Sequence, residues 1–459
     1  MTESFDGISF DDVEKLVARY ASPGIRPGLE RAERLLSLLG DPQRAYPSVH
    51  VVGTNGKGST CAMLDSVFRA AGYRTALYTS PHLESPGERL LIDGKPLTPA
   101  RWMAAVEKTV AALESDPALR SDPPSYFELV TAAAFLLAKE ERVEFAVVEA
   151  GLGGRLDATN LLGDVACSVV CSISMDHTEY LGDALEKIAG EKFAVARPAK
   201  PACYLGDAPG LIPLFEEFCA RVNAVPFVVG RDAVVGAATV TETGCVFDFS
   251  MFSAGGLNLS GVRTGLTGRY QVSNAALALL TLSRLTERFG RLTEPAIRAG
   301  LLSARWPGRL EIVSRAPTVV LDGGHNLDGV TKLVESLAEL WGDRRIGLVY
   351  GVMKDKDYPA CLEILNGLRG SNGEAPSFCA TQVPGMERSL AADVLAERAR
   401  QMKWTGAVEG YENPLDAIER ASGENDVVVV CGSLYLIGWV RPKLLAAGGV
   451  LADGENVPR

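Results

Sequence analysis

One glycine-rich stretch, Val51–Thr60, most constrains what this chain can fold into; it reads VVGTNGKGST. It lies between a short apolar, β-branched run and a segment whose apolar residues recur at helical spacing. Three glycines allow backbone N–H groups to converge on an anion, and the start of the helix adds a positive dipole end. Lys57 offers a compact charge to phosphate, and Ser59 offers a hydroxyl to phosphate or Mg²⁺. The stretch therefore predicts a nucleotide-binding loop.

The stretch departs from the strict phosphate-loop pattern GxxxxGK[ST], because Gly58 separates Lys57 from Ser59. A glycine-rich structural turn without a ligand is the competing interpretation. The position of the stretch between a strand and a helix favours nucleotide binding.

Strands and helices alternate through the first half of the chain. The pattern predicts strands at residues 48–52, 75–78, 145–148 and 169–173, and helices at 57–71 and 183–197. Continuous apolar strands separated by helices form parallel sheets that are covered on both faces. We therefore expect a mainly parallel sheet in this part of the chain.

The second half begins with an irregular segment of β character at residues 202–266, in which strands are expected at 227–229, 233–240 and 245–251. Helices are expected at 273–289 and 294–302, before a stretch whose proline and glycine end the helical pattern. The alternation then restarts, with strands at 318–321, 346–350 and 427–431. We predict an α/β protein: a P-loop ATPase domain with a mainly parallel sheet (1–303), a linker (304–310) and a smaller Rossmann-like α/β domain (311–459).

Composition narrows the class of ligand. The 459 residues carry a formal net charge of −11, so the surface as a whole repels nucleic acid and anionic lipid, and an anionic ligand needs a concentrated local positive site. Nine scattered cysteines without a CxxC pair are typical of a reducing cytoplasm and predict neither disulfides nor a zinc site. Residues 1–20 lack the pattern of a signal peptide, and no apolar run reaches the roughly 18 to 20 residues of a membrane span. We expect a cytoplasmic protein.

Polar residues follow three of the predicted strands: Ser80, Glu149 and His177. Since the carboxyl ends of parallel strands meet at one edge of a sheet, these side chains are candidates for a Mg²⁺ site, because Mg²⁺ needs few protein ligands. Taken singly, each has an ordinary alternative as a turn serine, a capping acid or a surface histidine. Lys192, taken singly, is a solvated helix lysine.

Several motifs occur together in an order that resembles the folylpolyglutamate synthase and dihydrofolate synthase family, within the Mur ligase superfamily. They are residues 53–59 (GTNGKGS), 79–83 (TSPHL) with Glu88-Arg89, Phe127-Glu128, 149–160 (EAGLGGRLDATN), Asp176-His177, 306–309 (WPGR) and 322–326 (DGGHN). The resemblance extends over about residues 24–432, which is nearly the whole chain.

The resemblance implies a role for each matching position. ATP would be bound by Thr54, Asn55, Gly56, Lys57, Gly58, Ser59, Asn274, Arg309 and Asp322, and Mg²⁺ by Ser80, Glu149, His177 and Lys192. Lys192 would be carbamylated and would reach a second Mg²⁺; Lys57, Lys192 and His325 would be the catalytic residues. The pterin-bearing substrate would contact Ile25, Arg26, Phe127, Glu128, Leu156, Asp157 and Ala158.

Three positions depart from the family pattern. Gly324 replaces the usual alanine before the histidine, residues 192–195 read KFAV in place of KAGI, and residues 85–88 read SPGE where the family has FNE. These changes bear on the loop after residue 322, on packing around Lys192 and on the substrate-side loop.

The implied function is an ATP-dependent ligase that joins L-glutamate to dihydropteroate, to the glutamyl tail of a folate, or to both, through an acyl-phosphate. The implied partners are these small molecules, with neither nucleic acid nor a membrane, and the family is usually monomeric. Two alternatives are a Mur-type ligase acting on a cell-wall nucleotide precursor and an ATP-binding regulatory module. Residues 157–160 and Phe127-Glu128 favour folate over the first, and Glu149, His177 and Lys192 would have no role in the second.

Overall fold

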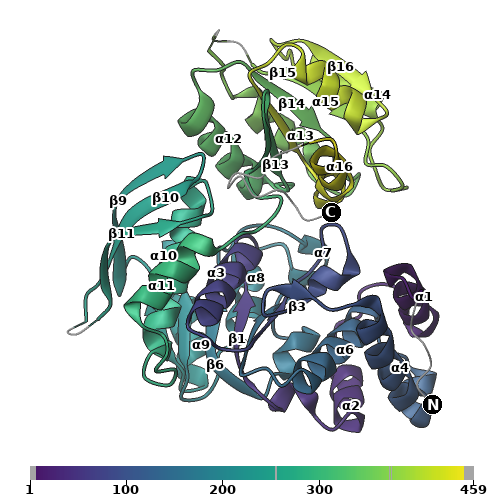
Figure 1. Ribbon diagram of the computed structural model, residues 1–459, viewed down its shortest axis with the longest axis vertical. Helices are drawn as coiled ribbons and strands as arrows, with labels where there is room; N and C mark the ends of the chain where they lie inside the picture. Colours follow the sequence, from purple (N-terminus) through teal and green to yellow (C-terminus); the bar gives the residue numbers. More distant parts are fainter. Residues whose placement is uncertain (1–6, 254–255, 372, 374, 449–459) are drawn as a thin grey trace. The chain divides into compact units, whose positions relative to one another are not determined.

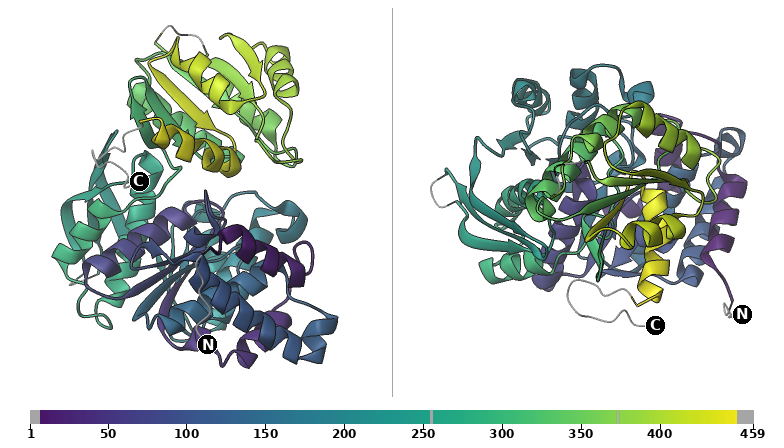
Figure 2. Two further views of the ribbon diagram at one scale, coloured as in Figure 1. Left: turned by 45° about the vertical axis from the view of Figure 1, so that its right-hand side comes forward. Right: turned by 90° about the horizontal axis from the view of Figure 1, so that it is seen from above.

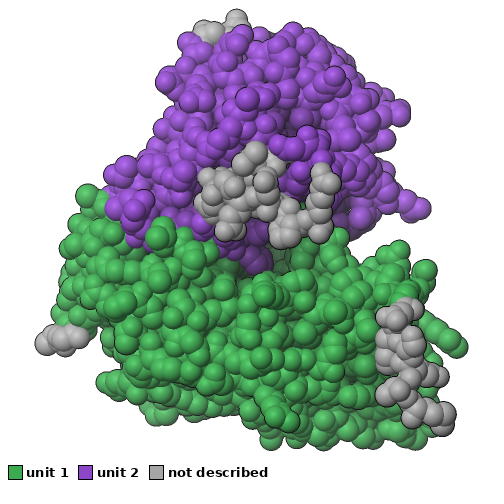
Figure 3. Space-filling view, viewed as in Figure 1, with its two compact units in different colours: residues 1–237, 247–262, 273–304 green, residues 238–246, 263–272, 305–459 purple. Residues whose placement is uncertain are grey.

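A sheet of eight strands carries the glycine-rich stretch (Figure 1). The computed structural model describes residues 7–253, 256–371, 373 and 375–448, so residues 1–6 of the amino-terminal segment considered above lie outside it. The chain divides into two units, coloured in Figure 3. Unit 1 comprises Met1–Ala237, Phe247–Val262 and Ser273–Ala304, and unit 2 comprises Ala238–Val246, Arg263–Val272 and Arg305–Arg459.

The large sheet has the strand order β4-β3-β2-β5-β1-β6-β7-β8. From β2 to β8 along this order the neighbours are parallel, while β3 pairs antiparallel with both β2 and β4. The strands are β1 (Pro47–Val52), β2 (Thr75–Tyr78), β3 (Leu90–Ile92), β4 (Lys95–Pro96), β5 (Phe145–Glu149), β6 (Asp164–Val170), β7 (Pro201–Tyr204) and β8 (Val225–Val228). The predicted mainly parallel sheet is confirmed.

Helices cover both faces of this sheet (Figure 2). The helix after the glycine-rich stretch, α3 (Lys57–Ala70), packs on β1, β2 and β5 and against α11 (Glu294–Ser303). A separate core joins α1 (Phe10–Tyr20), α2 (Glu30–Leu38), α4 (Pro99–Ser115) and α6 (Tyr126–Glu140) to β2, β3, β5 and β6. The remaining helices of this part of the chain are α5 (Pro117–Ser121), α7 (Thr178–Leu181), α8 (Leu185–Phe193), α9 (Ile212–Arg221) and α10 (Arg269–Leu285).

Several predicted boundaries are wrong. The fourth strand, predicted at 169–173, is β6 (Asp164–Val170), because Ser168 is buried there with its hydroxyl donated to Val195 O at 2.7 Å. The segment read as irregular and β-rich contains α9, whose Phe215 and Cys219 are buried. The helix predicted at 183–197 is shorter, as α8, and the one predicted at 273–289 begins and ends four residues earlier, as α10.

Two further sheets complete the fold. A three-stranded sheet has the order β11-β10-β9, with β9 (Ala233–Thr241), β10 (Gly244–Met251) and β11 (Asn258–Thr264). A six-stranded sheet has the order β12-β13-β17-β14-β15-β16, and only β12 pairs antiparallel. Its strands are β12 (Glu311–Arg315), β13 (Thr318–Asp322), β14 (Ile346–Tyr350), β15 (Ser377–Thr381), β16 (Val408–Tyr411) and β17 (Val427–Cys431).

The helices of unit 2 flank the six-stranded sheet. One core joins this sheet to α12 (Leu327–Trp341), α13 (Tyr358–Asn366) and α14 (Ala392–Gln401). The other helices, α15 (Pro414–Ser422) and α16 (Leu434–Ala446), contact the same sheet outside that core. The predicted second, smaller α/β domain fold is confirmed.

Two observations bear on the expectations from composition. Within the described residues, no helix is long and apolar enough to span a membrane. All nine cysteine thiols are free and buried.

Candidate active site

The glycine-rich loop between β1 and α3 is held by close backbone packing. Gly53 has φ +153°, and a Cβ there would lie 2.6 Å from the Cβ of Cys171. Gly56 has φ +84°, and a Cβ there would lie 2.5 Å from Asn274 Oδ1. Only glycine fits both the backbone conformation and the space at these two positions. The packing also places Asn274, from α10, directly against the loop.

The loop is also fastened to the segment that follows β6. Thr54 N donates to Ser172 O at 2.7 Å, and the Thr54 hydroxyl donates to Ser174 O at 3.0 Å. Ser172 Oγ in turn donates to Asn55 O at 3.1 Å. These bonds fasten the loop to residues 172–174 at the start of α3, where the buried Ser59 lies in the first turn.

Two lysines converge on one carbonyl of this loop. Lys57 Nζ donates to Gly53 O and Thr54 O, both at 3.1 Å, and Lys192 Nζ from α8 donates to Gly53 O at 2.9 Å. Lys192 is only 3% exposed, and burial, followed by repulsion from Lys57, lowers its pKa to about 7. Two lysine amines therefore meet at this loop in a chain that is acidic overall.

A buried carboxylate lies beside the lysines. Glu149, 5% exposed at the end of β5, lies 3.9 Å from Lys57 Nζ and accepts a hydrogen bond from Ser80 N at 3.4 Å. Its backbone neighbour across the sheet is Val51, two residues before the loop. The structure thus brings Lys57, Lys192, Ser80 and Glu149 to one edge of the sheet, as the order of parallel strands predicts.

His177 stands at the amino-terminal end of α7 with φ +50°. Its ring lies 3.9 Å from the carboxylate of Asp176, and its side chain is about half exposed. Residues 171–176 separate His177 from the end of β6 at Val170. The predicted strand at 169–173 had placed His177 only four residues after the strand end.

The residues present fit a magnesium ion that keeps most of its ligands from water and phosphate. Within the described residues, no group of three or more His, Cys, Asp or Glu side chains could hold a metal ion alone. The Glu149 carboxylate and the Ser80 hydroxyl are hard oxygen ligands on neighbouring strand ends, which suits Mg²⁺ bound jointly with a triphosphate.

The loop after β5 folds around the carboxylate of Asp157. Oδ2 accepts from Leu152 N at 2.8 Å, and Oδ1 accepts from Thr159 N at 3.0 Å and from the Thr159 hydroxyl at 2.5 Å. Burial raises the pKa of Asp157, while these hydrogen bonds oppose the shift. Leu156 is half-buried and Ala158 is buried at the start of the short 3₁₀ helix η3 (Ala158–Leu161).

Two aromatic side chains pack beside this loop. A Cβ on Gly151 would lie 2.6 Å from the ring of the half-buried Phe127, so backbone and ring are in close contact. Tyr78 lies with its ring centre 6.4 Å from that of Phe127. The half-buried Phe127 ring therefore packs against Gly151 on this loop and lies near Tyr78, which is buried.

Two of the remaining predicted substrate residues, Arg26 and Glu128, make internal contacts. Arg26 donates to Asp122 Oδ1 at 2.5 Å and to Pro123 O at 3.2 Å. Glu128 accepts from Ser125 N at 2.7 Å in the capping box of α6 and lies 3.3 Å from Arg31 Nε. Ile25 is half exposed and adjoins Arg26. Sequence reasoning did not reveal these partners.

Arg89 is a cation that the prediction of site residues left out. It is 8% exposed, donates through Nε to His82 Nδ1 at 3.1 Å and lies over the Tyr126 ring at 5.5 Å. Among the described residues, no carboxylate lies within ion-pair distance of it. The sequence signal for Arg89 was its place in the motif that begins at residue 79. An arginine that is buried without an acid partner is a candidate for anion binding.

The other predicted site residues lie in unit 2. Asp322, at the end of β13, accepts from Leu310 N at 3.0 Å, Gly324 N at 2.8 Å and the Tyr270 hydroxyl at 3.4 Å. Burial raises its pKa, and Arg309 opposes the shift. His325 Nδ1 contacts Gly323 O at 2.9 Å, and the same glycine packs against Arg309.

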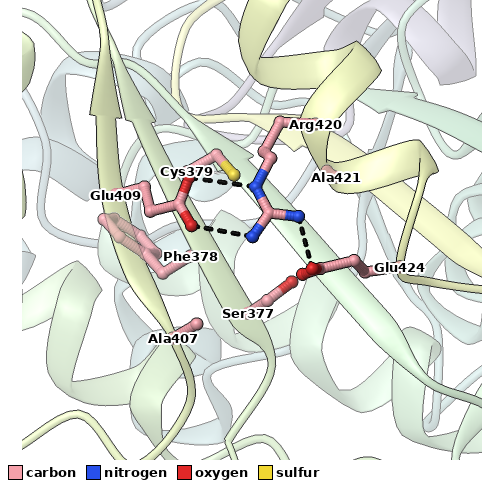
Figure 4. Close-up of a pocket in the computed structure, with 8 residues that line it drawn as sticks. All are labelled: Ser377, Phe378, Cys379, Ala407, Glu409, Arg420, Ala421 and Glu424. Carbon is pink, nitrogen blue, oxygen red and sulfur yellow. Dashed lines mark hydrogen bonds and ion pairs between the residues drawn. The ribbon is translucent and has the colours of Figure 1, made fainter.

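A small pocket elsewhere in unit 2 is lined by side chains that pair with one another (Figure 4). Arg420 donates to both carboxylate oxygens of Glu409, at 2.9 and 3.1 Å, and also pairs with Glu424. Two carboxylates face one guanidinium, so this pocket does not compete with the loop as an anion site.

Two family models match the chain. The Mur ligase middle domain matches residues 51–282, and the Mur ligase glutamate ligase domain matches residues 308–434. The dihydrofolate synthase/folylpolyglutamate synthase of Bacillus subtilis is 34% identical over 440 residues, covering 95% of this chain and 99% of the relative. The enzyme of the same name from Mycobacterium tuberculosis is 34% identical, covering 95% of this chain and 90% of the relative.

Solved structures agree over the same span. The folylpolyglutamate synthase of Mycobacterium tuberculosis, in complexes with ADP and AMPPCP, has a TM-score of 0.85 at 33% identity, with 95% of this chain and 98% of that chain covered. Escherichia coli FolC in complex with DHPP and ADP has a TM-score of 0.81 at 29% identity, with 96% and 99% covered.

Proposed function

We propose, from the premise that this chain belongs to the dihydrofolate synthase/folylpolyglutamate synthase family of Mur ligases, that it joins L-glutamate to dihydropteroate and to the glutamyl tail of tetrahydrofolate. Both acceptors end in a carboxylate, and both reactions convert ATP to ADP and phosphate. The observation that carries the proposal is the convergence of Lys57 and Lys192 on Gly53 O beside Glu149. This centre can receive a triphosphate and an acid together.

The nucleotide is assigned to residues 54–59. Relatives of this fold bind ADP and AMPPCP, and the N-terminus of α3 with Lys57 offers phosphate both dipole and charge. Asn274 lies against the same loop. Arg309 and Asp322 are proposed as further ATP contacts on the strength of their motifs, with His325 as a candidate catalytic residue.

Activation of the acid is the chemical problem that this centre addresses. Joining an ionised carboxylate to an amine needs a leaving group, so the carboxylate attacks the γ-phosphate in line and forms an acyl-phosphate. Two unit charges about 4 Å apart repel by roughly 4 kcal/mol at an effective dielectric of about 20. Lys57 offsets part of this repulsion and stabilises charge on the transferred group. The α-amine of glutamate then displaces phosphate.

Magnesium would be held by Ser80, Glu149 and His177, and when bound it would supply further charge neutralisation on the phosphates. Lys192 is proposed to be carbamylated. Its amine is buried 2.9 Å from Gly53 O beside another cation, where an anionic carbamate would balance Lys57 and offer an oxygen ligand to a second Mg²⁺. The proposed site would therefore hold two Mg²⁺ ions.

The acid substrate is assigned to the loop after β5. The half-buried Phe127 packs against Gly151 at the start of this loop, and the pterin is assigned to Phe127, Glu128 and residues 156–158. Escherichia coli FolC, which shares the fold, binds DHPP. Arg89 is buried and has no acid partner among the described residues, so we assign it as the cation that binds a carboxylate of the substrate.

Isotope transfer tests the proposal directly. Dihydropteroate carrying ¹⁸O in its carboxylate is incubated with ATP, Mg²⁺ and L-glutamate, and the amide product and the released phosphate are analysed by mass. An acyl-phosphate requires one labelled oxygen to move into phosphate as the amide forms. Amide without labelled phosphate would refute the mechanism, and labelled acid left unchanged would refute the function.

A further inference from the structure

A buried histidine on β1 is bonded to the loop that would hold the acid substrate. His50 is fully buried, and its Nε2 lies 2.8 Å from the Thr159 hydroxyl oxygen. That hydroxyl lies 2.5 Å from Asp157 Oδ1. The three side chains form a continuous chain of hydrogen bonds from the centre of the sheet to the carboxylate around which residues 151–159 fold.

Counting protons along this chain identifies the tautomer of His50. An ionised Asp157 can only accept, so the single hydroxyl proton of Thr159 is donated to Asp157. The Thr159 oxygen must then accept from His50, which requires the proton on Nε2. Nδ1 is left as a bare lone pair, and it is indeed buried without a hydrogen-bond partner.

The opposite direction of these hydrogen bonds, with a protonated Asp157, leaves a less favourable unsatisfied group. If Asp157 were protonated and donated to Thr159, the hydroxyl would donate to Nε2 and the proton of His50 would lie on Nδ1. A buried N–H donor would then have no acceptor, and orphaned buried N–H groups are rarer in proteins than unsatisfied acceptors. The hydrogen bonds from Leu152 N and Thr159 N also favour the ionised carboxylate.

The position of His50 connects two loops. It lies on β1 between Val148 of β5 and Ser168 of β6, three residues before Gly53, where the phosphate loop begins. Through Thr159 it also reaches the loop that follows β5. One rigid strand therefore supports both the loop assigned to nucleotide and the loop assigned to the acid.

We infer that His50 is a positioning residue for the acid substrate: as the Nε2–H tautomer it orients the Thr159 hydroxyl onto Asp157 and so fixes the shape of residues 151–159. The inference rests on the proposed function, because it takes that loop to bind the acid. His50 itself contacts neither substrate nor reacting atoms.

The kinetic test compares substitutions of His50. His50→Phe removes the donor, and we expect the KM for dihydropteroate to rise about tenfold, with the KM for ATP nearly unchanged, because the cost falls on one substrate loop. His50→Gln places an amide N–H near the position of Nε2 and should restore most of the affinity. Thr159→Val and Thr159→Ser form a second pair with the same expected order.

Ser48→Ala is the matched control. Ser48 is buried on the same face of β1, two residues away, and its hydroxyl donates to Asp164 O at 3.3 Å, outside the substrate loop. This variant should keep the wild-type KM for dihydropteroate. A rise equal to that of His50→Phe would mean that any polar loss in β1 disturbs the loop, and would overturn the inference.

The spectroscopic test is independent of activity and reads the tautomer in the wild type. The chain has four histidines, so ¹⁵N-histidine labelling of the full-length wild type, with His50→Gln for assignment, isolates the His50 ring signals. We expect protonated Nε2 and unprotonated Nδ1. A proton on Nδ1 would overturn the inference.

The two proposals fail in different ways. If the wild type forms no amide from any folate acceptor, the proposed function is wrong. If the wild type forms amide while His50→Phe and Thr159→Val keep the wild-type KM for dihydropteroate, the function stands and the role of His50 is wrong.

Discussion

Lys57 is the residue whose charge the proposed reaction needs most. Its ammonium contacts only backbone carbonyls of its own loop and lies 3.9 Å from Glu149, so truncation leaves the loop backbone in place. We expect Lys57→Ala to lower ATP turnover by about a hundredfold or more, with little change in thermal stability. Steady-state ADP release measures it, with the exposed Lys187→Ala as control. Wild-type rates in Lys57→Ala would mean that the phosphates bind elsewhere.

Lys192 is proposed to be carbamylated, and this modification can be tested. Lys192→Ala should remove most activity, and a short carboxylate such as acetate or formate should restore part of it if the native group is a carbamate. Restoration by alkylamines instead would indicate that the ammonium is the working form. A crystal map of the liganded enzyme grown with bicarbonate should show the added carboxylate, and a bare ammonium there would contradict carbamylation.

Glu409 tests the linkage between charge pairing and stability in unit 2. Hydrogen bonds from Arg420, and then from Tyr411, hold the pKa of Glu409 below its ordinary value. Because the folded pKa is depressed, this stabilisation is present above the unfolded pKa and is lost as pH falls through the folded value. Glu409→Gln should lower stability by about 0.2 to 1 kcal/mol at pH 7, the range for exposed pairs.

The difference between Glu409→Gln and the wild type should shrink as the pH is lowered below about 4, since protonated Glu409 no longer holds Arg420 by charge. Urea denaturation across this pH range measures it. A difference that stays constant with pH would show that packing, and not charge, connects these residues.

At the scale of elements, two helices approach so closely that only glycine fits. Gly300 of α11 is buried against α3, and a Cβ there would lie 2.3 Å from Val67 Cα. Gly300→Ala should lower the free energy of unfolding by about 1 to 3 kcal/mol, because the backbones must separate. Gly290 has open space around its Cα and is the matched control. Equal stability of the two variants in urea would contradict this packing.

Elements were predictable where their apolar residues were continuous. The spans of β2, β14 and β17 match the prediction, since each is short and buried and is bounded by polar residues or glycine. The span of β6 was missed because Asp164 and Ser168 interrupt its apolar pattern. In the fold the Ser168 hydroxyl donates a hydrogen bond to Val195 O, 27 residues away in sequence. Such long-range partners have no local signal.

The residues of the candidate site were predictable from local sequence pattern, but their distant partners were not. The phosphate loop and Glu149 follow from local pattern, because strand ends of a parallel sheet share an edge. The internal pairing of Arg26 with Asp122, and of Glu128 with Arg31, depends on contacts over about a hundred positions in sequence, and His50 reaches Thr159 over a similar separation. These partners required the fold.

At the scale of the whole molecule, the family assignment follows from two matched domains and from relatives that align along 95% of the chain. The fold class predicted from sequence holds in both units, because each is built on a largely parallel sheet flanked by helices. The division at residues 304–310, the monomeric state and the cytoplasmic location stay predictions, of which sedimentation of the purified protein tests the second.

The central claim is that ATP and an acid acceptor react with glutamate at the carboxyl edge of the first sheet. The most direct test is product analysis by mass after incubating the protein with ATP, Mg²⁺, L-glutamate and, separately, dihydropteroate or tetrahydrofolate. We predict that each acceptor gains one glutamyl residue for every ADP released. ADP release with both acceptors unchanged would contradict the account and would leave an ATP-binding module without ligase activity.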